Sequence, residues 1–344
     1  MAYTDIDKPS DYFETVLYAG NSGTQSITSL DFQPDWCWFK ARNNTDTHAV
    51  FDSVRGVTKR LIPDNTTAEG TQSNGLTHFL SNGFTVADAG ITNQGHNYVA
   101  WNWKAGTSVS GNTSGSGTAK AYSGSVNTDS GFSIIKYVGN GTSAHTIPHH
   151  LGAVPQWVLI KETSNASDWM GYHIGIGNTH TIKLNEPDAP VDRTDWWNDT
   201  TPTSSVVTLG DNGEINQNDT NYIMYSFSQK QGYSKFGSYT GNGNVDGTFF
   251  YTGFKPAFTI IRSTGSDQWS MFDAKRNPFN EVDNNIRANS NAAEADQANK
   301  EVDYLSNGVK LRTSSGEWNS SGTTYIYMAF AEQPFVTSTG VPAT

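Results

Sequence analysis

Carboxylates and tryptophans gather in one stretch of the chain, between residues 186 and 199. Two carboxylates beside an aromatic ring can hydrolyse a glycosidic bond, one as an acid of raised pKa and the other as base or nucleophile. The same oxygen atoms can hold a calcium ion. The third interpretation is a solvated acidic loop, which we favour because sequence spacing alone cannot place two carboxyl groups across a sugar. The residues are Glu186, Asp188, Asp192, Asp195 and Asp199, beside Trp196 and Trp197.

Flat aromatic side chains also suit the binding of sugar rings. The candidate glycan contacts are aromatic and amide side chains in polar stretches, namely Trp196, Trp197, Asn198 and Trp318. Most of the 10 tryptophans fall instead on expected strands, where they are predicted to be core residues. The stretch 174–204 is the best candidate for recognition because it combines two tryptophans with an amide and several carboxylates. The alternative is that both tryptophans pack against a neighbouring part of the protein.

Three histidines close together, His145, His149 and His150, could bind a metal ion. Their spacing matches no familiar zinc pattern, so a turn before the next strand is the favoured interpretation. A metal shared between copies of a symmetric assembly stays open as the alternative. The sequence has no nucleophile elbow, no phosphate-binding loop and no dinucleotide fingerprint. We therefore predict no catalytic residues, no metal site and no cofactor, and hence a protein that is not an enzyme.

The elements that must position these residues repeat three times along the chain. A strand-like segment with a proline near its start occurs at residues 32–40, 154–161 and 254–262. A Tyr/Gly/Asn turn precedes each copy, and an apolar strand closes each unit, at residues 97–103, 221–227 and 324–330. A unit of about a hundred residues is too long for a solenoid repeat and has the size of a β-domain.

The predicted fold is all-β, with three repeated antiparallel β-sandwich domains of jelly-roll type. Aromatic strands, frequent turns and little helical periodicity support this prediction. Long divergent inserts at 54–77, 174–204 and 275–303 should carry recognition. We expect Trp36, Trp157 and Phe258 to occupy equivalent buried sites. The predicted organisation is a lead at 1–11, repeat 1 at 12–104, a Gly/Ser/Thr linker at 105–131, repeat 2 at 132–230, repeat 3 at 233–335 and a tail at 336–344.

The composition of the chain limits the classes of partner that it is expected to bind. A net charge of -11, with only 22 Lys and Arg residues, argues against nucleic acid, whose phosphates need clustered cations. The sequence shows no secretion signal and no apolar run that could span a bilayer, so we expect a soluble protein made in a cytoplasm, without membrane insertion. The single cysteine, Cys37, excludes an intrachain disulfide and is expected to be a small buried hydrophobe.

Several stretches carry a family resemblance: residues 51–59, 100–106, 234–243, 254–257 and 325–332. Over nearly its whole length, the chain resembles a repeat-bearing family of virion proteins from tailed phages, often marine, with tail-fibre-like or lectin-like domains. The resemblance implies concanavalin-like or SPRY-like sandwiches and a structural or host-contact role. It implies no catalytic residues.

Three function classes follow. The leading prediction, which rests on the resemblance, is a phage virion structural protein made in the host cytoplasm: a fibre, a spike, or a capsid or tail decoration subunit, with a role in host-surface attachment. Its expected partners are other virion proteins, further copies in a homo-oligomer with a trimer favoured, and a host surface polysaccharide. The alternatives are a glycan-binding adhesin, recognised by saturable glycan binding, and a polysaccharide depolymerase, recognised by turnover.

Overall fold

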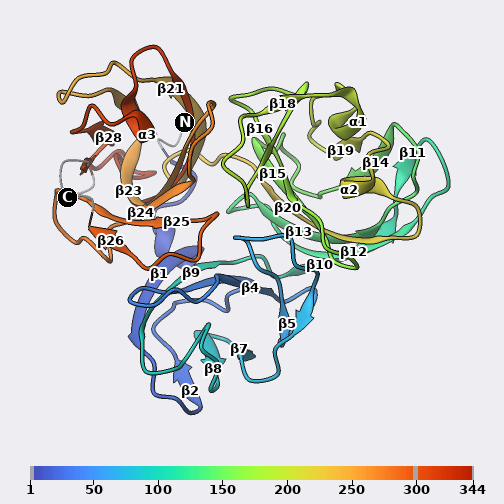
Figure 1. Cartoon of the computed structure of the whole chain (residues 1–344), viewed down its shortest axis with the longest axis horizontal. Coiled ribbons are helices and arrows are strands. Elements are labelled where there is room, and N and C mark those ends of the chain that lie inside the picture. Colours follow the sequence, from blue (N-terminus) through green and yellow to red (C-terminus); the bar gives the residue numbers. More distant parts are fainter. Residues whose placement is uncertain (1–3, 297–300, 343–344) are drawn as a thin grey trace.

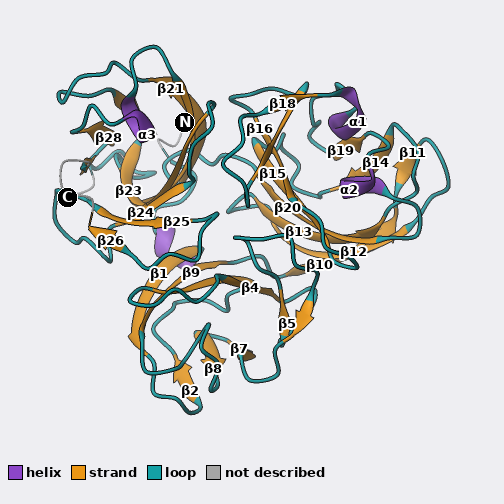
Figure 2. Cartoon of the chain, viewed as in Figure 1, coloured by secondary structure: helices purple, strands orange, loops and turns teal. Residues whose placement is uncertain are grey.

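The computed structural model describes residues 4–296 and 301–342. These residues form antiparallel β-sheets, which confirms the predicted all-β fold class (Figure 2). Three β units surround a common centre (Figure 1). No described helix combines the length and apolar character needed to cross a membrane. The helical turns within the described residues are η1 (Pro9–Asp11), α1 (Thr194–Trp197), α2 (Gly213–Asn216) and α3 (Gly316–Asn319).

The first unit packs a large sheet against a small one, and both are antiparallel. The large sheet has the order β1 (Phe13–Ala19), β9 (Asn97–Trp103), β3 (Trp36–Ala41) and β4 (Ala49–Asp52). The small sheet has the order β2 (Gln25–Ile27), β8 (Gly83–Val86) and β7 (Leu76–Leu80), and a separate pair is formed by β5 (Lys59–Arg60) and β6 (Gly70–Thr71).

The second unit repeats this plan with a wider large sheet. Its order is β10 (Thr107–Asn112), β12 (Ala121–Asn127), β13 (Phe132–Val138), β20 (Asn221–Phe227), β15 (Trp157–Glu162), β16 (Trp169–His173), β17 (His180–Lys183) and β18 (Val191–Asp192). The small sheet has the order β11 (Ser114–Gly115), β14 (His145–Pro148) and β19 (Val206–Leu209). Helices α1 and α2 lie on either side of β19 in the sequence.

The third unit has the same arrangement again. Its large sheet has the order β21 (Ser234–Thr240), β29 (Thr324–Pro334), β23 (Phe254–Ser263), β24 (Ser270–Asp273), β25 (Asn284–Arg287) and β26 (Ala295–Asp296). The small sheet has the order β22 (Phe249–Tyr251), β28 (Gly308–Leu311) and β27 (Val302–Leu305). The shared plan is the structural basis of the threefold sequence repeat.

Residues 105–131, expected to be a linker, belong to the second unit. Strand β12 pairs with β13 along all but its first residue, from Tyr122↔Tyr137 to Asn127↔Phe132, and β10 pairs with the outer edge of β12. Strand β11 adds to the edge of β14. The side chains of Tyr122 and Val126 are buried in the core of the unit. The predicted boundary at residue 132 is therefore corrected, because the second unit begins with β10.

The lead and the tail lie against the body of the protein. Thr4 donates a hydrogen bond to the Gln231 carbonyl at 2.8 Å, beside the join between units two and three. Ile6 enters the central core. The backbone N–H of Ser338 donates to Asp7 at 2.6 Å, which joins tail to lead. Residues 1–3 and 343–344 of the predicted lead and tail lie outside the described residues, as do residues 297–300 of the third insert.

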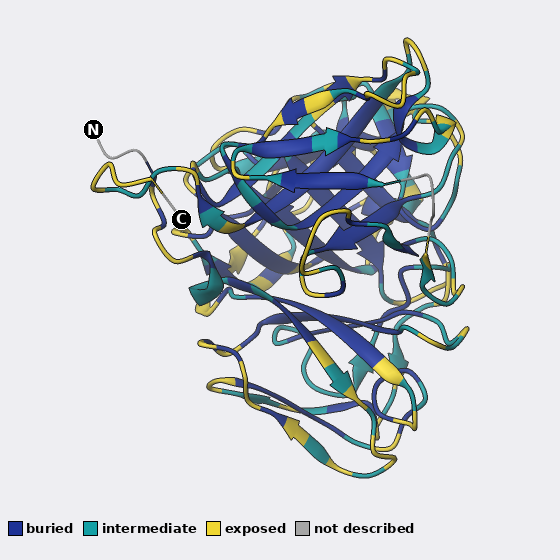
Figure 3. Ribbon diagram, turned by 90° about the vertical axis from the view of Figure 1, so that its left-hand side faces the viewer, coloured by how far each residue is buried: buried dark blue, intermediate teal, exposed yellow. Residues whose placement is uncertain are grey.

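A central hydrophobic core is shared by all three units, in addition to a core inside each one. Trp36, Trp157 and Phe258 lie in this central core, which confirms their predicted equivalence. Each pairs with the last residue that its closing strand contributes to the central core, as Trp36↔Trp103, Trp157↔Phe227 and Phe258↔Phe330. Figure 3 shows the buried strands that cross the middle of the molecule. The three units therefore form one body and bury their inner sheet faces against each other.

A ring of equivalent hydrogen bonds closes this threefold arrangement. One aromatic or histidine residue at the start of β4, β16 or β24, or directly before it, donates a ring N–H to a backbone carbonyl of a neighbouring unit. The three bonds are Trp169 to Ile62 at 2.8 Å, Trp269 to Lys183 at 2.9 Å and His48 to Arg287 at 3.1 Å. Because unit two binds unit one, unit three binds unit two and unit one binds unit three, the ring closes within a single chain.

Candidate functional site: a pocket in the second unit

A repeated hydrogen-bonded clamp fixes the turn before each closing strand. In unit two, the Asn216 side chain accepts a hydrogen bond from the Asn140 backbone at 3.0 Å and donates to the Gly210 carbonyl at 2.7 Å. The Tyr222 hydroxyl donates to the Gly213 carbonyl at 2.5 Å. The counterparts in the other units are Asn93 with Tyr98 and Asn319 with Tyr325. The clamp holds α2 in place, and α2 carries Glu214.

Helix α1 places two adjacent tryptophans in different surroundings. Asn198 ends the helix in the left-handed conformation, with φ of 50°, and the Gly210 N–H donates to the Trp196 carbonyl at 2.6 Å. Trp197 points into the core of the unit, edge-on to Tyr172 with ring centroids 6.0 Å apart. Trp196 is also well buried, but its side chain lines a pocket.

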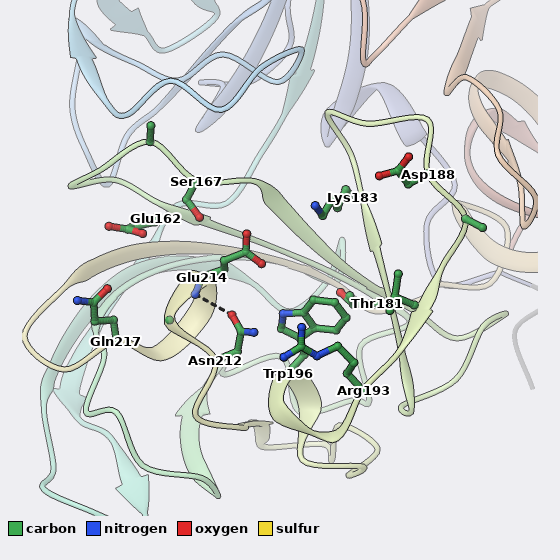
Figure 4. Close-up of a pocket in the computed structure, with 14 residues that line it drawn as sticks. Glu162, Ser167, Thr181, Lys183, Asp188, Arg193, Trp196, Asn212, Glu214 and Gln217 are labelled. Atoms are coloured by element: carbon green, nitrogen blue, oxygen red, sulfur yellow. Dashed lines mark hydrogen bonds between the residues drawn. The ribbon is translucent and has the colours of Figure 1, made fainter.

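This pocket has a volume of about 630 Å³, within the range of small-ligand sites. Its walls come from the β15–β16 loop, β17, the segment before α1, α1 itself and α2 with the residues around it (Figure 4). The polar and aromatic residues that line it are Glu162, Ser167, Thr181, Lys183, Asp188, Arg193, Trp196, Asn212, Glu214 and Gln217. Amides, carboxylates, hydroxyls and cations thus converge on one cavity.

The charges in the pocket are unevenly paired. The Lys183 ammonium forms a salt bridge with Asp168 at 2.6 Å, and the Arg193 guanidinium forms one with Asp195. Glu214 makes no salt bridge with any residue that the structure describes. Burial, together with the nearby Asp168 carboxylate, raises the pKa of Glu214 above its usual value. Glu214 thus faces this site without an ion-pair partner of its own, although Lys183 and Arg193 lie near enough to oppose the rise in its pKa.

The indole N–H of Trp196 faces into the pocket, toward Glu214 and Asn212 (Figure 4). Trp196 is only 4% exposed, and its Nε1 atom makes no hydrogen bond of ordinary geometry with a described residue, although the N–H lies near enough to the Glu214 carboxylate to oppose the rise in its pKa. The Arg193 guanidinium lies over the indole ring, 5.3 Å from the ring centroid. Because Arg193 covers that face of the ring, the pocket offers the N–H edge of Trp196 to a ligand, and a buried donor of this kind gains by finding an acceptor.

The other two units show what is particular to unit two. The strand register places Lys183 and Arg287 at equivalent positions, and the repeated clamp does the same for Glu214 and Glu317. In unit three these positions form an ion pair, Arg287 to Glu317 at 2.6 Å. In unit one the two corresponding residues are the apolar Ile62 and Ile91. The carboxylate without a cation is thus a feature of unit two.

Residues 8–334 match a family model described as a domain of unknown function, DUF7483. The chain belongs to this family. The match runs through all three units, in agreement with the core that they share. No curated protein and no solved structure matches the chain. Because the description of the DUF7483 family names no activity, function has to be argued from the site itself.

Of the four glycan contacts predicted for this DUF7483 chain, Trp196 alone lines the pocket. Trp197 and Trp318 are buried in the cores of units two and three, and neither offers a ring face to a ligand. The Trp318 N–H donates to the Ser270 hydroxyl at 2.7 Å. Asn198 caps α1 and does not line the pocket. The prediction is corrected for Trp197 and Trp318, because packing in the cores buries their rings, whereas for Asn198 it stays a prediction.

In the acidic stretch Asp188, Asp192 and Asp199 are exposed, as in the favoured solvated-loop interpretation, and the three histidines are held by local hydrogen bonds. Of the five predicted carboxylates, Asp188 lines the pocket, and Asp195 holds Arg193. Within residues 4–296 and 301–342, no three His, Cys, Asp or Glu side chains come together as a metal site. The histidine partners are Asn216 and Thr113 for His145, the Thr203 carbonyl for His149 and the Tyr122 hydroxyl for His150. Burial lowers the pKa of His149 to about 4.

Sequence reasoning missed most of the pocket. Glu214, Asn212 and Gln217 belong to the clamp region, and Lys183 ends a strand. One signal pointed there: the tetrapeptide Gly-Glu-x-Asn occurs at 213–216 and again at 316–319, in each case before a closing strand. A repeated carboxylate at an expected turn would have marked Glu214 and its counterpart Glu317.

Proposed function

We propose that this protein is a virion structural protein of a tailed phage that attaches to host surfaces, and that its second unit binds a saccharide without cleaving it. The phage setting rests on the sequence resemblance alone. The saccharide rests on one observation: a pocket in which the indole N–H of Trp196 makes no hydrogen bond of ordinary geometry with a described residue and faces amide and carboxylate groups. Sugars carry many hydroxyl groups that both donate and accept hydrogen bonds, so they match such a lining.

The rigidity of the site supports a binding role. The pocket wall at α2 is held by the Asn216 and Tyr222 clamp, and the wall at α1 is held through Gly210. A preformed pocket loses less conformational entropy when a ligand binds. In an attachment protein, such sites present the same geometry in every copy, and several weak contacts add up through multivalency.

The test replaces the indole N–H while keeping an aromatic ring. Trp196→Phe should weaken saccharide binding by about two- to tenfold, the worth of one neutral hydrogen bond. The measurement is binding of the purified full chain to a glycan array and to host cells. Trp197→Phe is the matched control, because its Nε1 also lacks a partner but faces the core. Equal binding by both variants and the parent would overturn the role of the pocket.

A polysaccharide depolymerase is the second candidate, and one observation favours it. A carboxyl of raised pKa, here the half-buried Glu214, is what a general acid requires. Release of reducing ends from host polysaccharide, lost in Glu214→Gln, would establish turnover. Binding without release of reducing ends would leave the non-catalytic role in place.

For assembly, we propose a homo-oligomer, with a trimer favoured from the resemblance. The inner sheet faces are already buried within one chain, so copies would have to meet through outer surfaces. Unit three exposes large apolar side chains there, among them Phe249, Tyr251 and Phe279. Light scattering of the purified protein measures the state directly, and a monomer at micromolar concentration would refute the proposal.

A further inference from the structure

The charge balance of the pocket in unit two indicates what its ligand carries. Three carboxylates line the cavity, Glu162, Asp188 and Glu214, and none makes a salt bridge with a described residue. The two lining cations, Lys183 and Arg193, are each bound to a carboxylate outside the lining. The pocket therefore has more carboxylates than cations in its lining, and each lining cation already has another carboxylate as its ion-pair partner.

The third unit shows how the chain satisfies the equivalent carboxylate. There, Glu317 is paired with Arg287 at 2.6 Å. In unit two the corresponding cation, Lys183, is held instead by Asp168, whose position is taken in unit three by Gln268, a neutral side chain. Asp168 thus draws Lys183 away, and Glu214 faces the cavity without the cation that its counterpart has.

We propose that the pocket binds an amino sugar, with a free ammonium group of the ligand at Glu214 and a hydroxyl oxygen accepting from the Trp196 N–H. This inference rests on the proposed saccharide function and names the class of saccharide. A half-buried carboxylate such as Glu214 gains more from a charged donor than from a neutral hydroxyl. The indole N–H requires an acceptor, and a sugar hydroxyl supplies one within the same molecule. A bare metal cation would satisfy the carboxylates and leave the indole donor unpaired.

The experiment compares two probes that differ only at the amino groups, which are free and charged in one and acetylated and neutral in the other. Short chitosan oligosaccharides carry free amino groups, and chitin oligosaccharides of the same length carry acetylated ones. Calorimetry of the full chain, at a pH where the amino groups are protonated, should give at least about tenfold tighter binding of chitosan. Glu214→Gln should remove that preference. Glu317→Gln is the control, since it removes the same charge from the equivalent position of unit three, where Arg287 is the partner.

The outcomes separate this inference from the proposed function. Equal or tighter binding of chitin oligosaccharides would overturn the amino-sugar assignment and leave saccharide binding standing. Failure of both probes, together with an empty glycan array, would overturn both. Chitosan binding that survives Glu214→Gln, or that falls equally in Glu317→Gln, would show general attraction to an acidic protein and would also overturn the assignment. Binding of Ca²⁺ alone that depends on Glu214 would do the same.

Discussion

Trp269 and Trp36 lie in the same central core but use their indole N–H groups differently. Trp269 donates to the Lys183 carbonyl of the neighbouring unit at 2.9 Å, whereas the Trp36 N–H has no partner among the described residues. Replacement by phenylalanine removes the same atoms from both sites. Trp269→Phe should therefore destabilise the protein by roughly 1–3 kcal/mol more than Trp36→Phe, because a buried carbonyl loses its donor. Urea unfolding measures the difference, and equal losses would contradict it.

At the level of single residues, the sequence predicted the core better than the site. Trp36, Trp157 and Phe258 follow a repeated proline within apolar runs, and that repetition identified them as equivalent core positions. Trp197 and Trp318 stand in polar surroundings, which suggests exposure. Their burial depends on the short helices α1 and α3, which turn one side chain inward and are too brief to leave a periodic pattern.

Strands β10 and β12 lead to a prediction about a segment whose composition resembles that of a linker. Because β12 pairs with β13 from Tyr122 to Asn127, its amide hydrogens should exchange slowly, at rates close to those of β13. Hydrogen exchange followed by mass spectrometry measures this. Peptides from the acidic stretch around residues 186–189, which lies outside the strands, provide the fast-exchanging reference. Fast exchange throughout residues 105–131 would restore the linker interpretation.

The linker prediction failed for a physical reason. Residues 105–131 are rich in Gly, Ser and Thr, a composition typical of flexible segments. Tyr122 and Val126 nevertheless fall on the same face of a strand and reach the core of the unit. Glycine is needed at Gly124, where a Cβ atom would lie 2.3 Å from the Ile134 carbonyl oxygen of the neighbouring strand. Composition does not record such pairing, since it depends on a partner that is distant until the sheet forms.

For the whole molecule, the repeat predicted three sandwiches but not their common core. The signal was present in the strands themselves. β3 and β15 are buried at every position and β9 at all but its first, and each contains four consecutive apolar residues without alternation. Such runs indicate sheets covered on both faces, as in layered α/β proteins. In this chain the second cover is a neighbouring unit, which the sequence of one unit cannot show.

The interfaces between units should make the protein sensitive to acid. His48 donates to the Arg287 carbonyl and His173 donates to the Tyr327 carbonyl, so each histidine joins two units. Burial lowers the pKa of His48 to about 3 and that of His173 to about 4, from 6.5 in an exposed histidine. Between the lowered pKa of each buried histidine and the ordinary value of 6.5, the unfolded chain takes up protons that the folded chain does not. The free energy of unfolding should therefore fall as the pH drops below 6.5. The contribution of the two neutral histidines to stability should be fully present only above that pH.

Denaturant unfolding at about pH 7 and about pH 5 tests this acid dependence, because few carboxylates titrate in that window. The variant with His48→Gln and His173→Gln keeps side chains that can donate at both interfaces but cannot gain a proton. It should be less stable at neutral pH, since glutamine fits the ring sites poorly, and its stability should change less between the two pH values. His180→Gln is the control, because this histidine lies in unit two and hydrogen-bonds its neighbour Thr179 rather than another unit. An unchanged slope in the double variant would show that acid acts through other groups.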